Sequence, residues 1–283
     1  MTATYLIDGV PLDDPAGRWT LNDATRLPAA AVPRVSRLDL PYRDGVIAAR
    51  QGWAEGHVRL ALDLAADDGP HKRAGNYDLS PLDGYRSMLS ALIAGGRKLT
   101  WRPRLGAPSR TTEIIEADIA EMNRVTDWGV LIASLTVQPF WAEDSAPVTA
   151  AVQPVGTGVV FAEFAGSTAR LADAIVRVTG PISALAITDQ VTKTGITYAP
   201  ALPAGSHLYY DTASGRAWTS TSTTLWTPGA SKADVDWPMH GPLQVWPAPQ
   251  GPDLAQMAPR LAFNGANTSS ATKLTIRARR HFL

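Results

Sequence analysis

Apolar and polar residues alternate with a period of two along several stretches of the chain, which predicts half-buried β-strands. In residues 58–64, written V-R-L-A-L-D-L, four large apolar residues fall on one face of an extended segment. Arg59 and Asp63 fall on the other face. Residues 130–141 continue the pattern over a greater length and predict one long strand. The first half of the chain is therefore expected to consist mainly of antiparallel strands.

A third alternating stretch covers residues 113–121. If this stretch is extended throughout, Ile115, Ala117 and Ile119 share one side, and the acidic residues between them share the other. We therefore expect Ile115 to lie on the buried side of its strand.

One segment of the first half has the period of an α-helix instead. Ser80 is followed by Pro81 at the first helical position and by Asp83 in the first turn, an order typical of a helix start. Apolar residues then recur at helical spacing, and Gly95 and Gly96 mark the end of the run. These apolar residues are Tyr85, Met88, Leu89, Leu92 and Ile93. We predict a single helix of about four turns.

The amino-acid composition of the sequence changes after Trp141. Residues 142–158 consist largely of Ala, Pro, Thr, Val and Gly, which indicates a domain boundary. Short strand-like segments follow, separated by turn residues, and this spacing favours an antiparallel sandwich. The predicted strands are residues 174–179, 184–188, 195–198, 207–210, 216–219 and 273–279.

Composition excludes several classes of function. The chain of 283 residues carries 26 basic and 26 acidic side chains, and this balance argues against nucleic acid as a partner, because duplex binding needs surplus cations. Cysteine is absent, which excludes disulfides and thiolate metal sites. No apolar run approaches the roughly 20 residues of a membrane span. The first residues also lack the pattern of a signal peptide, so we expect a soluble protein without membrane insertion or an export signal.

Motifs for catalysis are almost lacking. The five histidines are too far apart in the sequence for a local zinc site, and phosphate-loop, dinucleotide and nucleophile-elbow patterns are absent. We therefore expect no enzymatic activity, no catalytic residues, no metal and no cofactor. Among the paired acids, only Asp234 and Asp236 would share a face of an extended segment, next to Trp237. They keep a glycan hydrolase as a third, weaker hypothesis.

Tryptophan is the more informative residue type. Four of the nine tryptophans, Trp218, Trp226, Trp237 and Trp246, lie within a short part of the second half. Exposed indoles can stack on sugar rings, which predicts a glycan site. Alternatively, the four rings fill the sandwich core or a subunit interface, where tryptophan is equally useful. We favour the second interpretation and keep the first.

Several segments in a fixed order carry a resemblance to a known family. The N-terminal strand and turn, the helix between two strands, and the Q-P-F-W exit at residues 138–141 occur in the family's order. Residues 41–47, P-Y-R-D-G-V-I, look like one of its hairpins, and residues 203–211, P-A-G-S-H-L-Y-Y-D, look like another. The chain resembles the distal tail proteins of long-tailed, non-contractile bacteriophages, often labelled minor tail proteins in phages of actinobacteria.

The resemblance implies a mainly β fold with two domains. Residues 1–145 would form an antiparallel β-sandwich or split barrel with one α-helix, and residues 146–283 a galectin-like β-sandwich. The first domains would form a ring, a homo-hexamer in the family, at the tail tip of the virion. That ring would connect the tail tube protein to the tail hub or tail-associated proteins and fibres, around the tape-measure protein. The family has no catalytic residues, and its members assemble in the host cytoplasm.

A carbohydrate-binding adhesin that recognises host cell-surface glycans is the alternative hypothesis. It is motivated by the four clustered tryptophans and by the galectin-like domain that the resemblance implies, and it is compatible with a place in a tail. Residues 220–259, rich in Thr, Trp and Pro, show no strand pattern, so the sequence assigns them no role.

Overall fold

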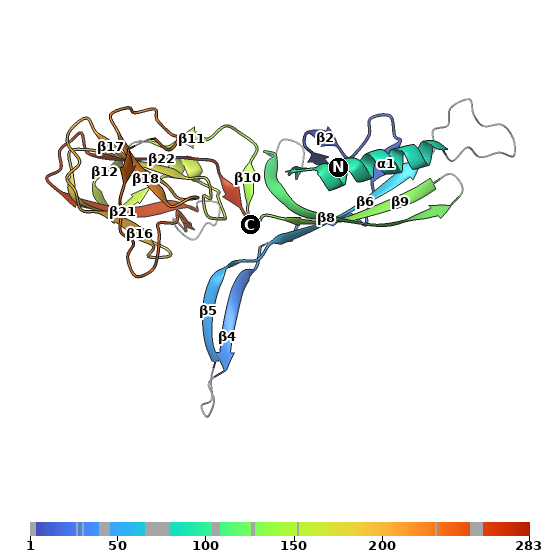
Figure 1. Ribbon diagram of the computed structural model, residues 1–283, viewed down its shortest axis with the longest axis horizontal. Helices are drawn as coiled ribbons and strands as arrows, with labels where there is room; N and C mark the ends of the chain where they lie inside the picture. Colours follow the sequence, from blue (N-terminus) through green and yellow to red (C-terminus); the bar gives the residue numbers. More distant parts are fainter. Residues whose placement is uncertain are drawn as a thin grey trace. The chain divides into compact units, whose positions relative to one another are not determined.

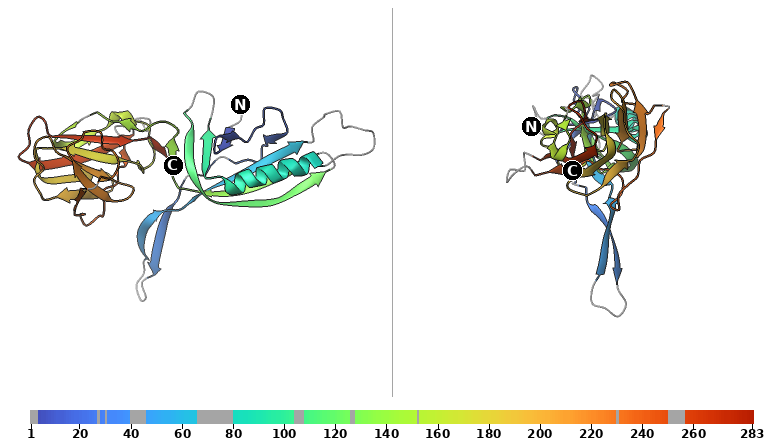
Figure 2. Two further views of the ribbon diagram at one scale, coloured as in Figure 1. Left: turned by 45° about the horizontal axis from the view of Figure 1, so that its top comes forward. Right: turned by 90° about the vertical axis from the view of Figure 1, so that its left-hand side faces the viewer.

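The computed structural model describes most of the chain, in two compact units. Unit 1 comprises Met1–Asp144 and Leu283, and unit 2 comprises Ser145–Phe282. Both are built from antiparallel strands (Figures 1 and 2), which confirms the predicted mainly β fold class. The described residues are 4–26, 28–29, 31–39, 46–65, 80–103, 108–125, 128–151, 153–229, 231–249 and 257–283.

Unit 1 is organised around one curled antiparallel sheet. Its strands follow the spatial order β2-β1-β7-β8-β9-β6-β3, and β10 pairs with β8 beside this path. The strands are β1 (Thr4–Ile7), β2 (Val10–Pro11), β3 (Trp19–Leu21), β6 (Gly56–Ala65), β7 (Lys98–Arg102), β8 (Arg110–Val125), β9 (Trp128–Val137) and β10 (Trp141–Glu143). The predicted strand at residues 130–141 is therefore two strands, because residues 138–140, which include Pro139, leave the ladder.

The core of unit 1 lies between this sheet and the helix α1 (Ser80–Gly95). Alternate residues of β6 and β9 are buried on one face, as the period of two predicts. The helix lies along the curled sheet (Figure 2). It contacts β6, β8 and β9, and buries Leu82, Leu89 and Ile93 completely. Because its apolar residues recur at helical spacing, one side of the helix is apolar and covers the apolar face of the sheet. No helix in the described part of the chain has the length and apolar character needed to cross a membrane.

The expected burial of Ile115 is wrong. The register of β8 on β9 shifts between Ile114 and Glu116, so Ile114 pairs with Val137 and the pairing resumes with the residues after Ile115. Such a β-bulge adds one residue to the strand, so the residues after the bulge face the opposite side from the one that strict alternation predicts. Ile114 and Ala117 therefore face the core side together, and the side chain of Ile115 is 51% exposed.

Strands β4 (Pro33–Asp39) and β5 (Val46–Trp53) form a two-stranded sheet of their own. Figure 1 shows this hairpin extending away from the curled sheet of unit 1. Its base is tied by an ion pair between Arg34 and Glu55 and by the amide of Ala54, which donates to the carbonyl oxygen of Val32 at 2.8 Å. Residues 41–45, which carry most of the family-like P-Y-R-D-G-V-I segment, lie outside the described residues.

Unit 2 is an antiparallel sandwich of two sheets. One has the order β11-β22-β14-β17-β18-β19, with β12 on β22, and the other has the order β13-β21-β15-β16, with β20 on β21. Their facing sides share one apolar core, which includes Phe161, Phe164, Leu208 and Phe263. The strands are β11 (Val148–Thr149), β12 (Gln153–Pro154), β13 (Gly156–Val160), β14 (Ile175–Thr179), β15 (Ser183–Asp189), β16 (Gly195–Tyr198), β17 (His207–Asp211), β18 (Arg216–Ser220), β19 (Lys232–Ala233), β20 (Pro247–Ala248), β21 (Ala258–Ala266) and β22 (Lys273–Ala278).

The sequence patterns missed β21, although it is a central strand. It pairs with β13 and β15 and buries Leu261 and Phe263 in the core. Pro259 and Gly265 lie within it and are normally signs of a turn, so they conceal the strand in the sequence. Pro259 is tolerated near the start of the strand, where its carbonyl oxygen accepts from the amide of Phe161.

Close packing just after the end of α1 leaves room only for a glycine at position 96. A Cβ atom on Gly96 would lie 2.4 Å from Cγ2 of Ile7 and 2.9 Å from the carbonyl oxygen of Leu92. A Cβ atom on Gly95 would meet nothing within 4 Å. Neither residue has a positive φ, so the left-handed cap that glycines at a helix end usually supply is not used here.

These contacts predict opposite effects for two neighbouring substitutions. We expect Gly96→Ala to lower the free energy of unfolding by about 1–3 kcal/mol, because the new methyl group overlaps Ile7 and a carbonyl oxygen. Gly95→Ala is the matched control and should be neutral or stabilising by up to about 1 kcal/mol. Urea unfolding of the two variants measures both effects. Equal stability of the two variants would contradict the close approach at Gly96.

Candidate functional site

The structure separates the four tryptophans of the sequence prediction into different environments. Trp218 lies on β18, Trp226 in the loop after β18, Trp237 after β19, and Trp246 just before β20. Trp218 is buried, Trp226 and Trp246 are half-buried, and Trp237 is exposed. The four rings therefore do not form one surface.

Trp218 belongs to a row of side chains on the outer face of its sheet. Arg177 on β14 is in register with Tyr209 on β17, and Tyr209 is in register with Trp218. Their sequence neighbours Val176, Leu208 and Ala217 point into the core, so the row points the other way. The rings of Tyr209 and Trp218 stack, with centroids 5.4 Å apart and planes 5° from parallel.

The covering loop, residues 221–229, lies over this row. The hydroxyl of Tyr209 donates to the carbonyl oxygen of Ser222 at 2.5 Å, and the Arg177 guanidinium donates to the carbonyl oxygen of Thr223. Burial raises the pKa of Tyr209 above its ordinary value. The first part of the stretch without a strand pattern thus has a structural role, because it covers the outer face of a sheet.

Trp226 of the covering loop contacts both Tyr209 and Arg177 of the row. Its ring meets the ring of Tyr209 edge-on, with centroids 5.5 Å apart and an angle of 88°. The guanidinium carbons of Arg177 and Arg277 lie 5.0 Å and 5.8 Å from the centroid of the Trp226 ring. Two cation–π contacts and an aromatic contact hold the indole in place. These contacts favour a structural role for Trp226, as a plug that fills the space above the row, and they disfavour a sugar-stacking role.

Trp246 is held by the buried carboxylate of Asp189. The amide of Trp246 donates to Oδ2 of Asp189 at 3.0 Å, and its indole nitrogen donates to Oε1 of Gln244 at 3.1 Å. The other carboxylate oxygen accepts from the amides of Val191 and Thr192 and from the Thr192 hydroxyl. Burial raises the pKa of Asp189, while these hydrogen bonds favour its charged form. Trp246 is part of this structural network and lies outside the pocket described next.

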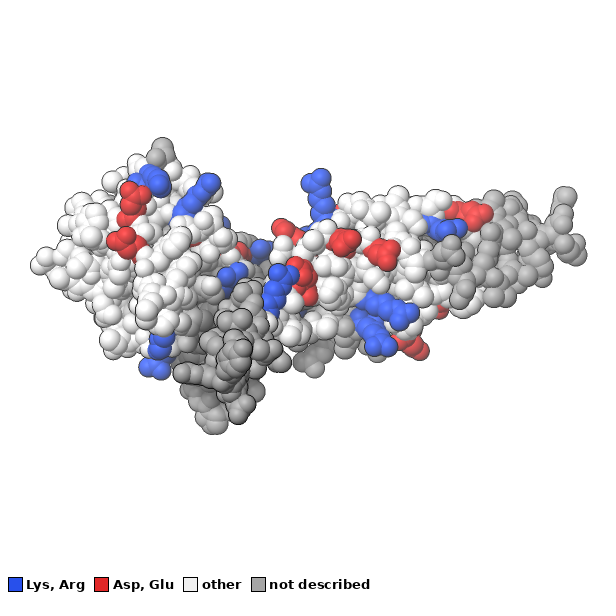
Figure 3. Space-filling model, turned by 60° about the horizontal axis from the view of Figure 1, so that its bottom comes forward, with Lys and Arg blue, Asp and Glu red and all other residues white. Residues whose placement is uncertain are grey.

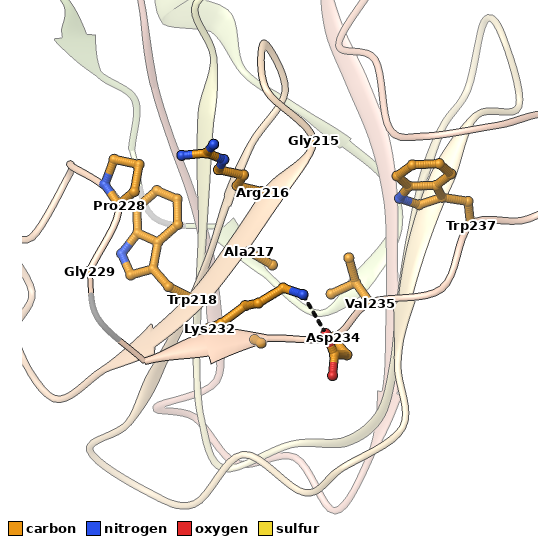
Figure 4. A pocket seen from close by; sticks show the side chains of 11 residues that line it. Gly215, Arg216, Ala217, Trp218, Pro228, Gly229, Lys232, Asp234, Val235 and Trp237 are labelled. Carbon is orange, nitrogen blue, oxygen red and sulfur yellow. Dashed lines mark ion pairs between the residues drawn. The ribbon is translucent and has the colours of Figure 1, made fainter.

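A pocket of about 540 Å³ lies next to the exposed Trp237 (Figure 4). One wall comes from β18, with Arg216, and another from the segment that begins at β19, with Lys232 and Asp234. Trp237 is 57% exposed, which is unusual for so large an apolar ring. The remaining lining residues are Gly215, Ala217, Trp218, Pro228, Gly229, Ala233 and Val235.

The acid pair of the hydrolase hypothesis does not form a catalytic arrangement. Asp234 lines the pocket, but its side chain is 95% exposed and its carboxylate lies 3.4 Å from the Lys232 ammonium group. Asp236 is held through its backbone, which exchanges hydrogen bonds with Thr197, and its side chain is exposed. The carboxylates of catalytic acid pairs in glycosidases converge in a partly enclosed site, and both of these side chains are exposed instead. Among the described residues, no group of three or more His, Asp or Glu side chains is placed to hold a metal ion.

Charge is dispersed over the face of the molecule drawn in Figure 3. Basic and acidic side chains of the described residues are scattered there over a mostly uncharged surface, and neither sign gathers into a large patch. A surface of this kind suits contacts in which both signs pair across an interface.

The fold of the whole chain matches that of a solved phage protein. The crystal structure of Dit from phage SPP1, described as a paradigm of the hub adsorption apparatus in phages that infect Gram-positive bacteria, aligns over 100% of both chains. The TM-score is 0.57 and the sequence identity is 13%. The chain has the fold of this Dit protein. The antiparallel sheet with one helix and the sandwich that follows it are thus the parts of a Dit-like architecture.

Two further solved structures align less well. They are the baseplate of phage p2 in its activated conformation with Sr and with Ca, each with a TM-score of 0.32 and 8% identity. The alignments cover 98% of this chain and 98% of the Sr structure's chain, and 99% and 98% for the Ca structure. A TM-score this low adds nothing to the Dit comparison. No known family model matches the sequence, and no curated protein matches it either.

The different environments of Trp226 and Trp237 predict different costs of truncation. Trp226→Ala should lower the free energy of unfolding by about 2–3 kcal/mol, because it removes packed ring contacts and uncovers the row beneath. Trp237→Ala should cost about 0.5 kcal/mol or less, because that ring is largely in solvent. Thermal and urea unfolding measure both changes. If Trp237→Ala proved the more destabilising variant, the assignment of Trp226 as the plug would fail.

Proposed function

We propose that the chain is a structural protein of the tail tip of a long-tailed phage. The observation that carries this proposal is the alignment with SPP1 Dit over the full length of both chains. In this role, unit 1 forms a ring of identical copies, six as in the distal tail family. The ring connects the tail tube to the hub or tail-associated proteins and fibres, around the tape-measure protein. The protein belongs to the virion, assembles in the host cytoplasm and has no enzymatic activity.

The hairpin β4–β5 supports self-assembly. Within the described residues each of its strands pairs only with the other, so both outer edges keep free backbone donors and acceptors. A two-stranded hairpin is at best marginally stable in water, and open edges invite pairing with another chain. We assign the second copy of unit 1 as the partner of this hairpin. Contacts of this head-to-tail kind generate closed rings when the rotation between copies closes.

The charge distribution of unit 1 is compatible with such a ring. Up to residue 143 the sequence has 16 basic and 18 acidic residues, so copies can approach without strong mutual repulsion. Both signs are available for pairing between a face of one copy and a different face of the next.

The hairpin assignment gives a direct test. Replacing residues 36–51 by a short turn should leave the rest of unit 1 folded, because the curled sheet and α1 do not use the hairpin. The variant should lose concentration-dependent self-association in sedimentation velocity, and it should fail to enter tails. Trp237→Ala, in unit 2, is the control that should assemble normally.

Electron microscopy of phage particles decides the location. Gold-labelled antibodies against the purified chain should mark the end of the tail, and the hairpin variant should give particles without label or without complete tails. Label on the capsid or no label on wild-type particles would contradict the proposal. Sedimentation alone is insufficient, because free subunits can stay monomeric until a tube ring templates them.

A second role, glycan binding by unit 2, is favoured by the pocket beside Trp237. A largely exposed indole next to charged and polar groups is an arrangement that suits sugar rings. Trp237 is the tryptophan to test for this role. The rings of Trp218 and Trp226 are both packed against the ring of Tyr209.

A glycan array tests this second role. Wild-type protein should bind a subset of the glycans, and Trp237→Ala should lose that binding while Met239→Ala, a change of a neighbouring exposed residue outside the pocket, should retain it. Absence of any binding by the wild type would remove the glycan role and leave the tail-tip proposal unaffected.

A further inference from the structure

We infer that β5 of one copy adds as a strand to the open edge of β8 in the next copy. The inference rests on the proposed function, in which the hairpin β4–β5 joins copies of unit 1, and it names the surface that receives the hairpin. It follows from three features of unit 1: a long unpaired edge of β8, acidic residues along that edge, and a basic hairpin whose second strand is suited to pairing.

One side of β8 is unpaired over most of its length. On the other side, β9 pairs with β8 from Ile114 to Val125. On this side, β7 pairs only with residues 110–113, and the amide of Ile114 then donates to the carbonyl oxygen of Arg97 at 2.8 Å. Within the described residues no strand continues this side, so residues 115–125 present an edge of backbone donors and acceptors. This edge is longer than β5, which has 8 residues.

The open part of β8 carries negative charge. Glu116 and Asp118 are exposed, and neither makes an ion pair or a side-chain hydrogen bond with another described residue. In register with Asp118 lie first Ser134 on β9 and then Arg59 on β6. Arg59 is thus two strands, or roughly 10 Å, from the open edge. The two carboxylates therefore keep an excess of negative charge at this edge.

An apolar side chain lies beside these two carboxylates. Ile115 is at the β-bulge of β8, and its side chain is 51% exposed. Bulges are frequent at sheet edges and at sites of recognition, where they redirect a side chain. A strand added to this edge would cover part of Ile115 and remove apolar surface from water.

The hairpin β4–β5 carries the opposite charge. Its two strands contain three arginines and one acid, namely Arg34, Arg37, Arg50 and Asp39. Arg34 is already paired with Glu55 at the base of the hairpin. Because Val35 pairs with Arg50, the register places positions 37 and 50 on the same face of the hairpin. Opposite charges on adjacent strands stabilise a pairing, so this face of the hairpin matches the acidic edge of β8.

Of the two strands of the hairpin, β5 is better suited to pair with β8. Strand β4 begins with Pro33, which has no amide donor, and it contains the acid Asp39. Strand β5 contains Arg50 and has neither proline nor an acid. In its own copy β5 pairs only with β4 (Figure 1), so its outer edge is free to form main-chain hydrogen bonds with another copy.

This contact joins two different surfaces, the hairpin of one copy and the β8 edge of the next. Each copy then gives a strand on one side and receives a strand on the other. A closed ring satisfies every hairpin and every β8 edge, whereas an open row of copies leaves one of each unpaired at its ends. The pairing therefore favours a ring over an open chain of copies.

Engineered disulfides test the contact directly, because the chain contains no cysteine of its own. Arg50→Cys is combined in one chain with Glu116→Cys or with Asp118→Cys. After mild oxidation, concentrated protein and assembled tails should give covalent chains of several copies on a non-reducing gel, since every copy carries both positions. Each single variant should give dimers at most. Arg50→Cys with Asp234→Cys, at an exposed acid of unit 2, is the matched control and should give no longer chains.

Charge reversal provides a second test. Glu116→Arg with Asp118→Arg should weaken self-association about tenfold, because cross-strand attraction becomes repulsion. Arg37→Glu with Arg50→Glu should weaken it to a similar extent. All four substitutions in one chain should restore association, since the charges are again opposite. Sedimentation and entry into tails measure the effect, and circular dichroism identifies any variant that does not fold.

The outcomes separate this inference from the proposed function. Complete tails that contain the cysteine variants but give no covalent chains would show that the hairpin binds elsewhere, so that the tail-tip role survives and the β8 contact does not. Equally long chains from the Asp234→Cys control would show non-specific collision and overturn the contact as well. Loss of association in both charge-reversed variants without recovery in the combined variant would show that the charges act at separate surfaces. Absence of the wild-type chain from tails would overturn the proposed function and the inference with it.

Discussion

Unit 2 depends on one constraint, which is that one sheet of its sandwich carries two large aromatic rings on its outer face in addition to its apolar inner face. The inner face closes the core, and the outer face carries the stacked rings of Tyr209 and Trp218. Most outer faces of a sandwich are polar and need no cover. Here the covering loop, with Trp226 between two arginines, removes the aromatic row from water. Residues that look like an unstructured Thr- and Trp-rich stretch in the sequence are therefore a third layer of the unit.

Unit 1 solves the same problem with a regular element. Its curled sheet is covered on the apolar face by α1, whose buried Leu82, Leu89 and Ile93 are spaced for one side of a helix. The two units thus use different covers, a helix in unit 1 and a loop in unit 2. In unit 1 the uncovered part is the hairpin β4–β5, with its backbone edges, and in unit 2 it is the pocket beside Trp237.

Local periodicity predicts most of the fold because most strands keep one face buried. Strands such as β6, β9 and β14, and the helix α1, follow from alternation or helical spacing alone. The failures have local causes: a bulge reverses the alternation at Ile115, and Pro259 and Gly265 conceal β21. The site was less predictable, since the sequence showed four tryptophans as a group. Which of them is a plug and which is exposed depends on the register that places Tyr209 between Arg177 and Trp218, and on a loop that folds back over that row.

The attachment of the covering loop has a consequence for how the surface of unit 2 can vary. Tyr209 and Arg177 hold the loop through the carbonyl oxygens of Ser222 and Thr223, which every residue type possesses. Thr221 and Thr223 are exposed, and their side chains are not needed for this anchoring, whereas the hydroxyl of Ser222 accepts from the amide of Thr224 within the loop. The identity of Thr221 and Thr223 can therefore vary at little cost in stability, because the layer beneath is held through backbone carbonyl groups that any residue supplies.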